Sequence, residues 1–139
     1  MEYDLFRFAI AHQRDYQQAL AEIKNGRKLS HWMWYIFPQL KGLGRSSTSD
    51  YYGIRDLDEA KAFLQDEDLG SHLLEISNVL LQLDCNDAKI VMGKPDDMKL
   101  KSCMTLFCLA DPDEEVFKEV LIKFFDRKPD YRTVTMINR

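Results

Sequence analysis

The stretch LGSHLLEISNVLLQL, residues 69–83, decides the fold class of this chain. Its apolar residues Leu73, Ile76, Leu80 and Leu83 recur three or four positions apart, which places their side chains on one face of an α-helix. The same period dominates the rest of the sequence, and the evidence for strands is thin. The sequence therefore predicts an all-α protein.

Comparable signals on either side of this stretch extend the prediction. Gly26 ends the first apolar face, Asp56 and Glu59 resemble a capping box, and Pro95 stands where proline is tolerated at the start of a helix. We expect helices over residues 4–24, 56–64, 69–83, 87–92, 95–110, 114–125 and 133–137. The connections are short, except for one long irregular loop from Pro38 to Ile54.

The segment WMWYIF, residues 32–37, has the composition of a short buried strand. No neighbouring segment offers it a partner, and a two-stranded element is marginal in water. The sequence thus indicates a single compact multihelical domain of about six or seven helices, spanning residues 1–139.

Length and charge exclude several classes of protein. A chain of 139 residues forms one domain and buries about 70% of the surface that its unfolded form exposes. A net charge of −4 argues against non-specific binding to nucleic acid. No apolar run approaches the roughly 20 residues that cross a bilayer, and the acidic start MEYDLFRF lacks a secretory signal. We therefore expect a cytoplasmic protein without a membrane partner.

Candidate metal ligands are few and scattered: Cys85, Cys103, Cys108, His12, His31 and His72. Their spacing fits neither a disulfide framework nor a zinc site. Cys103 and Cys108 lie in an apolar segment and are expected to be buried thiols. His12 and His72 have polar neighbours and are expected to lie on the surface. We predict no metal and no cofactor.

The segment SHWMWYIFPQLKGLGRSS, residues 30–47, combines residue types that rarely occur together. Trp32 and Trp34 are too close in sequence to share one helix face with Tyr35 and Phe37. The cluster can be buried in the core, where it anchors the packing of the helices, or it can form an aromatic surface on which a flat ligand such as a nucleobase stacks. Both interpretations hold if one tryptophan packs in the core and the other lines a cleft.

Polar residues in and after this segment suggest an anion site. His31 is a candidate acid or base, or else a structural histidine that bonds a backbone carbonyl. Gly42 and Gly44 let the backbone approach a ligand or adopt positive φ. The residues that follow carry hydrogen-bond donors that can bind an anion: Arg45, Ser46, Ser47 and Thr48. A simple glycine-rich turn without a ligand fits the sequence equally well.

A second polar group lies in PDDMKLKSCMTLF, residues 95–107. Lys99 and Ser102 are three positions apart and share a helix face, whereas Leu100 and Met104 face the core. A lysine and a serine on one face can hold a phosphate or a carboxylate. A solvated face with nothing bound is the alternative.

These segments, together with YYGI and LDEAKAFL, resemble the bacterial domain of unknown function 1810 family over essentially the whole chain. The resemblance implies a single compact multihelical domain and brings no reaction and no catalytic residues. The chain departs from the usual pattern at Cys103, where a second serine is common, so a hydroxyl at that position is not required.

Three hypotheses for function follow. The first is an enzyme or binding protein for an anionic, partly flat ligand, such as a nucleotide or an ADP-ribose-like compound, held between the aromatic segment and the helix that carries Lys99. His31 is the candidate catalytic base, and the candidate ligand-binding residues are Trp32, Trp34, Gln39, Arg45, Ser46, Lys99 and Ser102. The second is a non-enzymatic protein-interaction module that uses the aromatic loop. The third is that the motif is purely structural.

Overall fold

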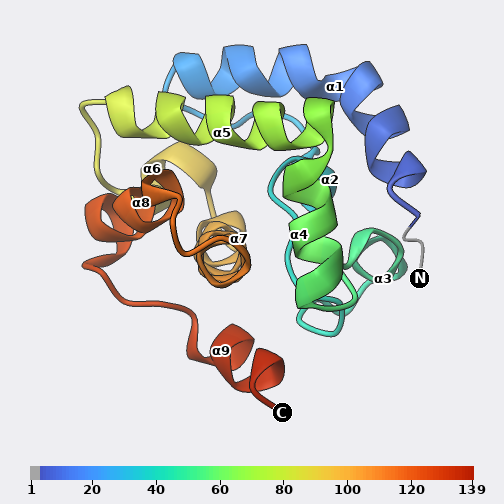
Figure 1. The fold of residues 1–139 in the computed structure, drawn as a ribbon. Coiled ribbons are helices and arrows are strands. Elements are labelled where there is room, and N and C mark those ends of the chain that lie inside the picture. The colour runs from blue at the N-terminus through green and yellow to red at the C-terminus, as the bar shows by residue number, and fades with distance from the viewer. Residues whose placement is uncertain (1–3) are drawn as a thin grey trace.

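The structure is a computed structural model that describes residues 4–139. These residues form one compact all-helical domain without a strand (Figure 1). Nine helices follow one another, so the predicted number of six or seven is wrong. They are α1 (Phe6–Lys24), α2 (Met33–Ile36), α3 (Ser47–Tyr52), α4 (Leu57–Gln65), α5 (Glu67–Gln82), α6 (Ala88–Met92), α7 (Asp96–Ala110), α8 (Glu115–Phe125) and α9 (Tyr131–Ile137).

The two helices that the prediction missed are α2 and α3. The possible strand at residues 32–37 is instead the single turn α2, and α3 interrupts the loop predicted to be irregular from Pro38 to Ile54. Helices of one or two turns contain too few residues for a period of 3.6 to be visible. The start of α3 has a local cause, because the Ser46 hydroxyl accepts a hydrogen bond from the Ser49 amide at 3.0 Å.

Side-chain caps set the start of the longer helices. Asp56 accepts a hydrogen bond from the Glu59 amide at 2.8 Å and opens α4 where the capping pattern predicts it. Asp66 accepts from the amides of Asp68 and Leu69, so α5 begins slightly before the predicted residue 69. Gly70 then lets α5 turn close against α4, since a Cβ there would lie 2.1 Å from the Leu64 carbonyl oxygen.

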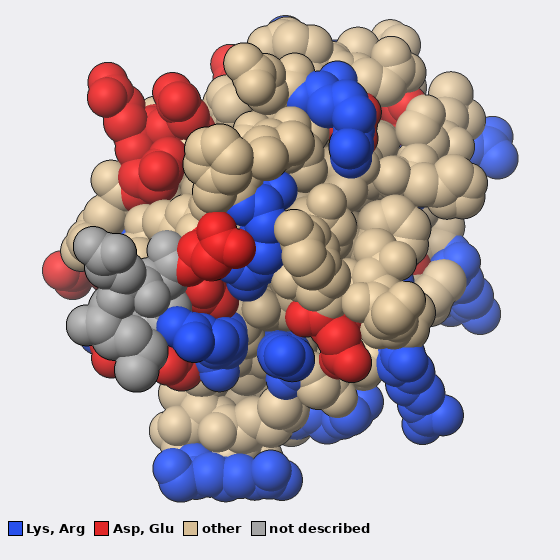
Figure 2. Space-filling view, turned by 90° about the vertical axis from the view of Figure 1, so that its right-hand side faces the viewer, with Lys and Arg blue, Asp and Glu red and all other residues tan. Residues whose placement is uncertain are grey.

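The helices surround α7. In Figure 1, α1 and α5 run side by side along the top, α4 and α8 flank α7, and α9 lies below it. Residues 102–107 of α7 are all buried. A chain of aromatic rings joins α1 to α4, α7 and α8 through the core, with centroid distances of 5.1, 5.4 and 5.8 Å; it consists of Phe8, Phe63, Phe107 and Phe117. Figure 2 shows the side formed by α3 and α4, where basic side chains gather along the lower margin.

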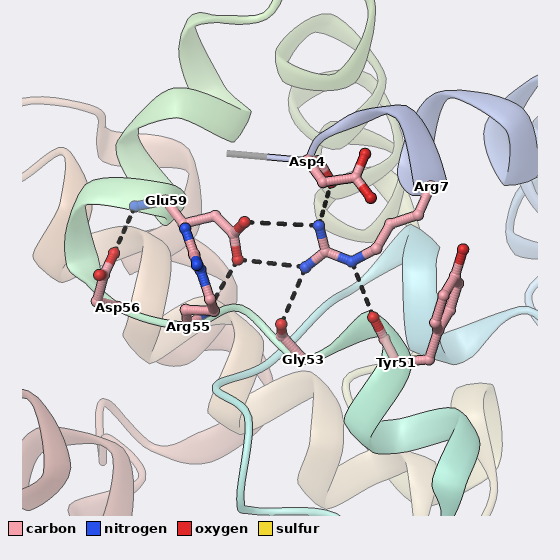
Figure 3. Close-up of polar contacts among 7 residues, drawn as sticks. All are labelled: Asp4, Arg7, Tyr51, Gly53, Arg55, Asp56 and Glu59. Atoms are coloured by element: carbon pink, nitrogen blue, oxygen red, sulfur yellow. Dashed lines mark hydrogen bonds and ion pairs between the residues drawn. The ribbon is translucent and has the colours of Figure 1, made fainter. Parts of the chain in front are cut away.

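A buried ion pair ties α1 to α4 (Figure 3). Arg7 Nη2 lies 3.2 Å from Glu59 Oε1, and the two side chains are only 8% and 1% exposed. The guanidinium also donates to the carbonyl oxygens of Tyr51 at 2.8 Å and Gly53 at 3.0 Å. Glu59 accepts a further hydrogen bond from the Arg55 amide at 2.8 Å. One guanidinium therefore fixes the end of α3 and the start of α4 against α1.

The Arg7→Met variant tests this network. Removing the cation leaves the Glu59 carboxylate buried without a counter-charge, so we expect the free energy of unfolding to fall by about 3–5 kcal/mol in urea titrations. Arg27→Met, which removes an exposed arginine, is the matched control and should change it by less than about 0.5 kcal/mol. Equal small effects in both variants would show that the pair is dispensable.

Candidate functional site

A cavity of about 610 Å³ opens beside His31, between α1, α2 and α3. Half of its lining residues are aromatic and the others carry polar side chains: Arg14, His31, Trp34, Tyr35, Ser47, Thr48, Tyr51 and Tyr52. The three elements are consecutive in the sequence, and the packing of α2 against both α1 and α3 forms the cavity.

Arg14 is held at the edge of the cavity by two neighbours. Its Nη2 donates to the Tyr35 hydroxyl at 3.3 Å, and its Nε donates to Asp15 Oδ2 at 3.0 Å. The Tyr35 hydroxyl itself donates to Asp15. Burial and this bond to the carboxylate raise the pKa of Tyr35 to about 12, so its proton stays in place at neutral pH. The guanidinium keeps Nη1 for another acceptor.

Several polar groups around the cavity have no partner in the described part of the chain. The imidazole of His31 and the hydroxyls of Ser47 and Thr48 make no hydrogen bond or ion pair within residues 4–139. His31 is exposed, while Thr48 is half-buried. A bound molecule therefore meets a donor and acceptor set that the fold leaves unused.

Glu22 fixes the segment that leads into the cavity. Its Oε1 accepts hydrogen bonds from the amides of Leu29 at 2.7 Å and Ser30 at 2.9 Å, and from Trp32 Nε1 at 2.9 Å. Burial alone would raise the pKa of Glu22, but the hydrogen bonds from Ser30, Gln18 and the backbone lower it to about 2. The carboxylate is thus charged at neutral pH and holds Trp32 in the core.

The two tryptophans have different environments. Trp32 is 1% exposed and belongs to the core, whereas Trp34 is half-buried and lines the cavity. The mixed interpretation, in which one ring packs and the other lines a cleft, describes this arrangement. A ring available for stacking is therefore Trp34 and not Trp32.

Lys99 and Gln39 lie behind Trp34. Together with Trp34 they line a separate space of only about 10 Å³, too small for a ligand. Lys99 Nζ lies 5.7 Å from the centroid of the Trp34 ring and 3.7 Å from Asp96 Oδ1. These two residues support the wall of the cavity and do not line it.

The other polar residues predicted for the site lie elsewhere. Ser102 is buried, and its hydroxyl contacts the Met98 carbonyl at 3.2 Å and Asp130 Oδ2 at 3.1 Å. Ser46 caps α3, and Arg45 is exposed outside the lining of the cavity. The four polar residues expected to share one pocket therefore do not converge. His31 lines this cavity, whereas the other three lie outside it: Arg45, Lys99 and Ser102.

Arg14, Tyr51 and Tyr52 line the cavity without having been predicted. An arginine on the solvent side of a long helix carries no distinguishing sequence signal. The tyrosines stand in the stretch YYGI, next to the glycine-rich loop, and nothing in their spacing points to a cavity. Gly44 closes that loop, because a Cβ there would lie 2.4 Å from Ser49.

His12 and His72 form a pair behind the site in which His12 is buried and His72 is half-buried, so the prediction that His12 lies on the surface is wrong. His12 is 3% exposed, and it sits one turn from both Phe8 and Tyr16 on the apolar face of α1. Its Nε2 donates to the Tyr35 carbonyl at 2.7 Å, and its Nδ1 lies 2.9 Å from His72 Nδ1. The ring of His72 stacks on Tyr16 with centroids 3.7 Å apart.

The proton positions in this pair follow from its partners. A carbonyl only accepts, so His12 carries its proton on Nε2 and accepts at Nδ1, which makes His72 Nδ1 the donor. The His12 ring is then neutral. Burial lowers the pKa of His12 from 6.5 to about 4 and also lowers the pKa of His72.

This pair predicts acid sensitivity. A folded-state pKa below the unfolded value means that the stabilisation is complete above about pH 6.5 and is lost as the pH falls towards 4. His12→Gln should lower the free energy of unfolding by about 1–3 kcal/mol at pH 7.5 and reduce its decrease between pH 6.5 and 4. His31→Gln, at an exposed histidine, should change neither. An unaltered pH profile in His12→Gln would refute the assignment.

A metal-ligand cluster and a membrane-spanning helix are both absent from the described residues. Residues 4–139 contain no group of three or more His, Cys, Asp or Glu side chains placed to hold a metal ion. None of the helices formed by those residues is both long enough and apolar enough to span a bilayer.

Comparisons with known proteins identify the family to which the chain belongs. A search of curated proteins gives no match. The crystal structure of the conserved hypothetical protein Rv1873 from Mycobacterium tuberculosis is similar, with 40% identity and a TM-score of 0.96 over 99% of this chain and 98% of that one. The family described as "Protein of unknown function (DUF1810)" matches residues 2–137. Since that match spans nearly the whole sequence, the chain belongs to this family.

Proposed function

We propose that the protein binds a small anionic ligand with a flat ring, of the nucleotide class, in the cavity between α1, α2 and α3. One observation carries the proposal: aromatic side chains, an arginine and unpartnered polar groups line a single cavity. Its volume of about 610 Å³ lies within the roughly 300–1,000 Å³ typical of small-molecule sites.

The lining suggests how such a ligand would lie. The flat ring would stack against Trp34, with Tyr51 and Tyr52 beside it. The anionic group would accept from Arg14 Nη1 and from His31, and the hydroxyls of Ser47 and Thr48 would bond its polar substituents. Because Asp15 offsets part of the arginine charge, a ligand with one phosphate or carboxylate fits better than a polyphosphate.

The proposed site and the site expected from the sequence both include the aromatic segment, but they differ in the helices that face it. The sequence suggests a cleft between the aromatic segment and the helix with Lys99, whereas the cavity lies between the aromatic segment and α1 and α3. His31 remains the candidate base. Binding is nevertheless the function we favour over catalysis, because no carboxylate orients the His31 ring within residues 4–139.

The protein-interaction alternative has one observation in its favour. Phe6 and Ile10 are one turn apart on α1 and are 70% and 51% exposed, and Tyr51 on α3 is 59% exposed. Exposed aromatic and aliphatic side chains are common anchors at interfaces. The aromatic segment itself presents no such surface, since Trp32 is buried and Trp34 is half-buried. Any partner surface would therefore lie on α1 and α3.

Calorimetric titration with adenosine monophosphate, and separately with ADP-ribose, tests the ligand proposal. We expect saturable binding of adenosine monophosphate. Trp34→Ala should weaken it about tenfold through loss of stacking, and Arg14→Gln should do so through loss of the charged donor. Thermal unfolding of each variant confirms that it is folded.

Ile10→Ser is the matched control, because it changes an exposed residue of α1 outside the lining of the cavity. Its affinity should equal that of the native protein. Absence of saturable heat with both compounds, or native affinity in Trp34→Ala, would contradict the proposal. Weaker binding in Ile10→Ser alone would point to the α1 surface instead.

A further inference from the structure

A second cavity lies against α9, beside Gly42 of the glycine-rich loop. It measures about 410 Å³ and is lined by Gly42, Tyr131, Arg132, Thr135, Met136 and Arg139. Two guanidinium groups line it and no carboxylate side chain does. Arg132 and Thr135 lie three positions apart on α9 and share a face of that helix, and Arg139 follows after the helix ends at Ile137.

An adjoining cavity of about 370 Å³ adds two basic residues to the lining, together with the acidic residues Asp56 and Asp58. It shares Met136 and Arg139 with the first, and Lys41 and Arg55 line it as well. A single parallel bridge between Leu40 and Ile54 sets these two residues side by side, because each follows a bridged residue. The bridged residues are buried and their successors are exposed, so both basic side chains project outward.

Three of the four basic side chains that line the two cavities make no direct pair with another described residue. Among residues 4–139, the side chains of Lys41, Arg132 and Arg139 have no hydrogen bond or ion pair. The chain as a whole carries a net charge of −4, so this local excess runs against its overall balance. In Figure 2 several basic side chains lie along the lower margin of the molecule, at the height of α9, and others lie at the centre, the right and the top of this face.

The position of α9 is fixed by partly buried hydrogen bonds to α7. Asp130 Oδ2 accepts from the Thr133 amide at 3.1 Å and from Ser102 on α7 at 3.1 Å. The Asp130 amide donates to the Thr105 hydroxyl at 2.8 Å, and Thr133 is completely buried. Ser102, predicted to contact a ligand directly, thus holds the helix that presents the arginines.

We propose that these two adjoining cavities form a binding site for a small molecule with two or more phosphate groups. Arginine forks match phosphate oxygens in a bidentate manner, and the Thr135 hydroxyl supplies a further donor. The ring of Tyr131 is 67% exposed at the edge of the site and is available to an organic group. Asp56 and Asp58 at the far end disfavour a long polyanion.

This site is independent of the proposed function. It shares no lining residue with the cavity beside His31, which offers one arginine and suits a single anionic group. The two proposals therefore fail separately: one depends on Trp34 and Arg14, and the other on Arg132 and Arg139.

Titration calorimetry with inorganic tripolyphosphate tests the site. We expect saturable binding that weakens at least tenfold in Arg132→Gln and in Arg139→Gln and disappears in the double variant. Arg132→Lys keeps the positive charge but loses the planar guanidinium that can make two hydrogen bonds to one phosphate, so it should give an intermediate affinity. Arg127→Gln, which removes an exposed arginine outside both cavities, should bind as the native protein does.

Three results would overturn the proposal: no saturable heat with tripolyphosphate, native affinity in the double variant, or an equal loss in Arg127→Gln. Binding of a ten-nucleotide single-stranded oligonucleotide without binding of tripolyphosphate would also overturn it, in favour of a nucleic-acid surface. Circular dichroism of every variant confirms that a loss of binding is not a loss of the fold.

Discussion

The buried carboxylate of Glu22 fixes the segment on which the proposed ligand site depends. A buried charge is tolerated only where donors replace its hydration, and here two backbone amides and the Trp32 indole do so. This arrangement turns Trp32 into the core directly before α2. Trp34, two residues later, then points to the cavity. The orientation of both tryptophans thus follows from one hydrogen-bonded carboxylate on α1.

Three polar attachments on α1 position every wall of the cavity. Arg7 holds the end of α3 through backbone carbonyls and binds Glu59 on α4, and His12 bonds the carbonyl of Tyr35 on α2. Glu22, near the other end of α1, holds the segment before α2. Apolar packing places the helices, and these directional bonds set how the short helices α2 and α3 lie on them. Helices of one or two turns have little stability of their own, so such bonds are needed.

Periodicity predicts the long helices α1, α5 and α8 well, because each buries a face that repeats over several turns. Helix α7 is buried on nearly all sides, and its predicted start rests on Pro95 instead. It fails for α2 and α3, whose conformation is imposed by contacts with distant residues. The site shows the same limit. His31 and Trp34 were expected to act together and do line one cavity, but Ser102 faces α9 and Lys99 backs Trp34. Which neighbour a polar helix face meets is decided by tertiary packing.

Nuclear magnetic resonance of the two tryptophan indole N–H groups tests the central claim most directly. The signals are assigned with the Trp34→Phe variant, and adenosine monophosphate is added to saturation. We expect the Trp34 signal to shift with ligand concentration, while the Trp32 signal, whose proton is hydrogen-bonded to Glu22, stays in place. An unchanged Trp34 signal, or an equal shift of both, would contradict it.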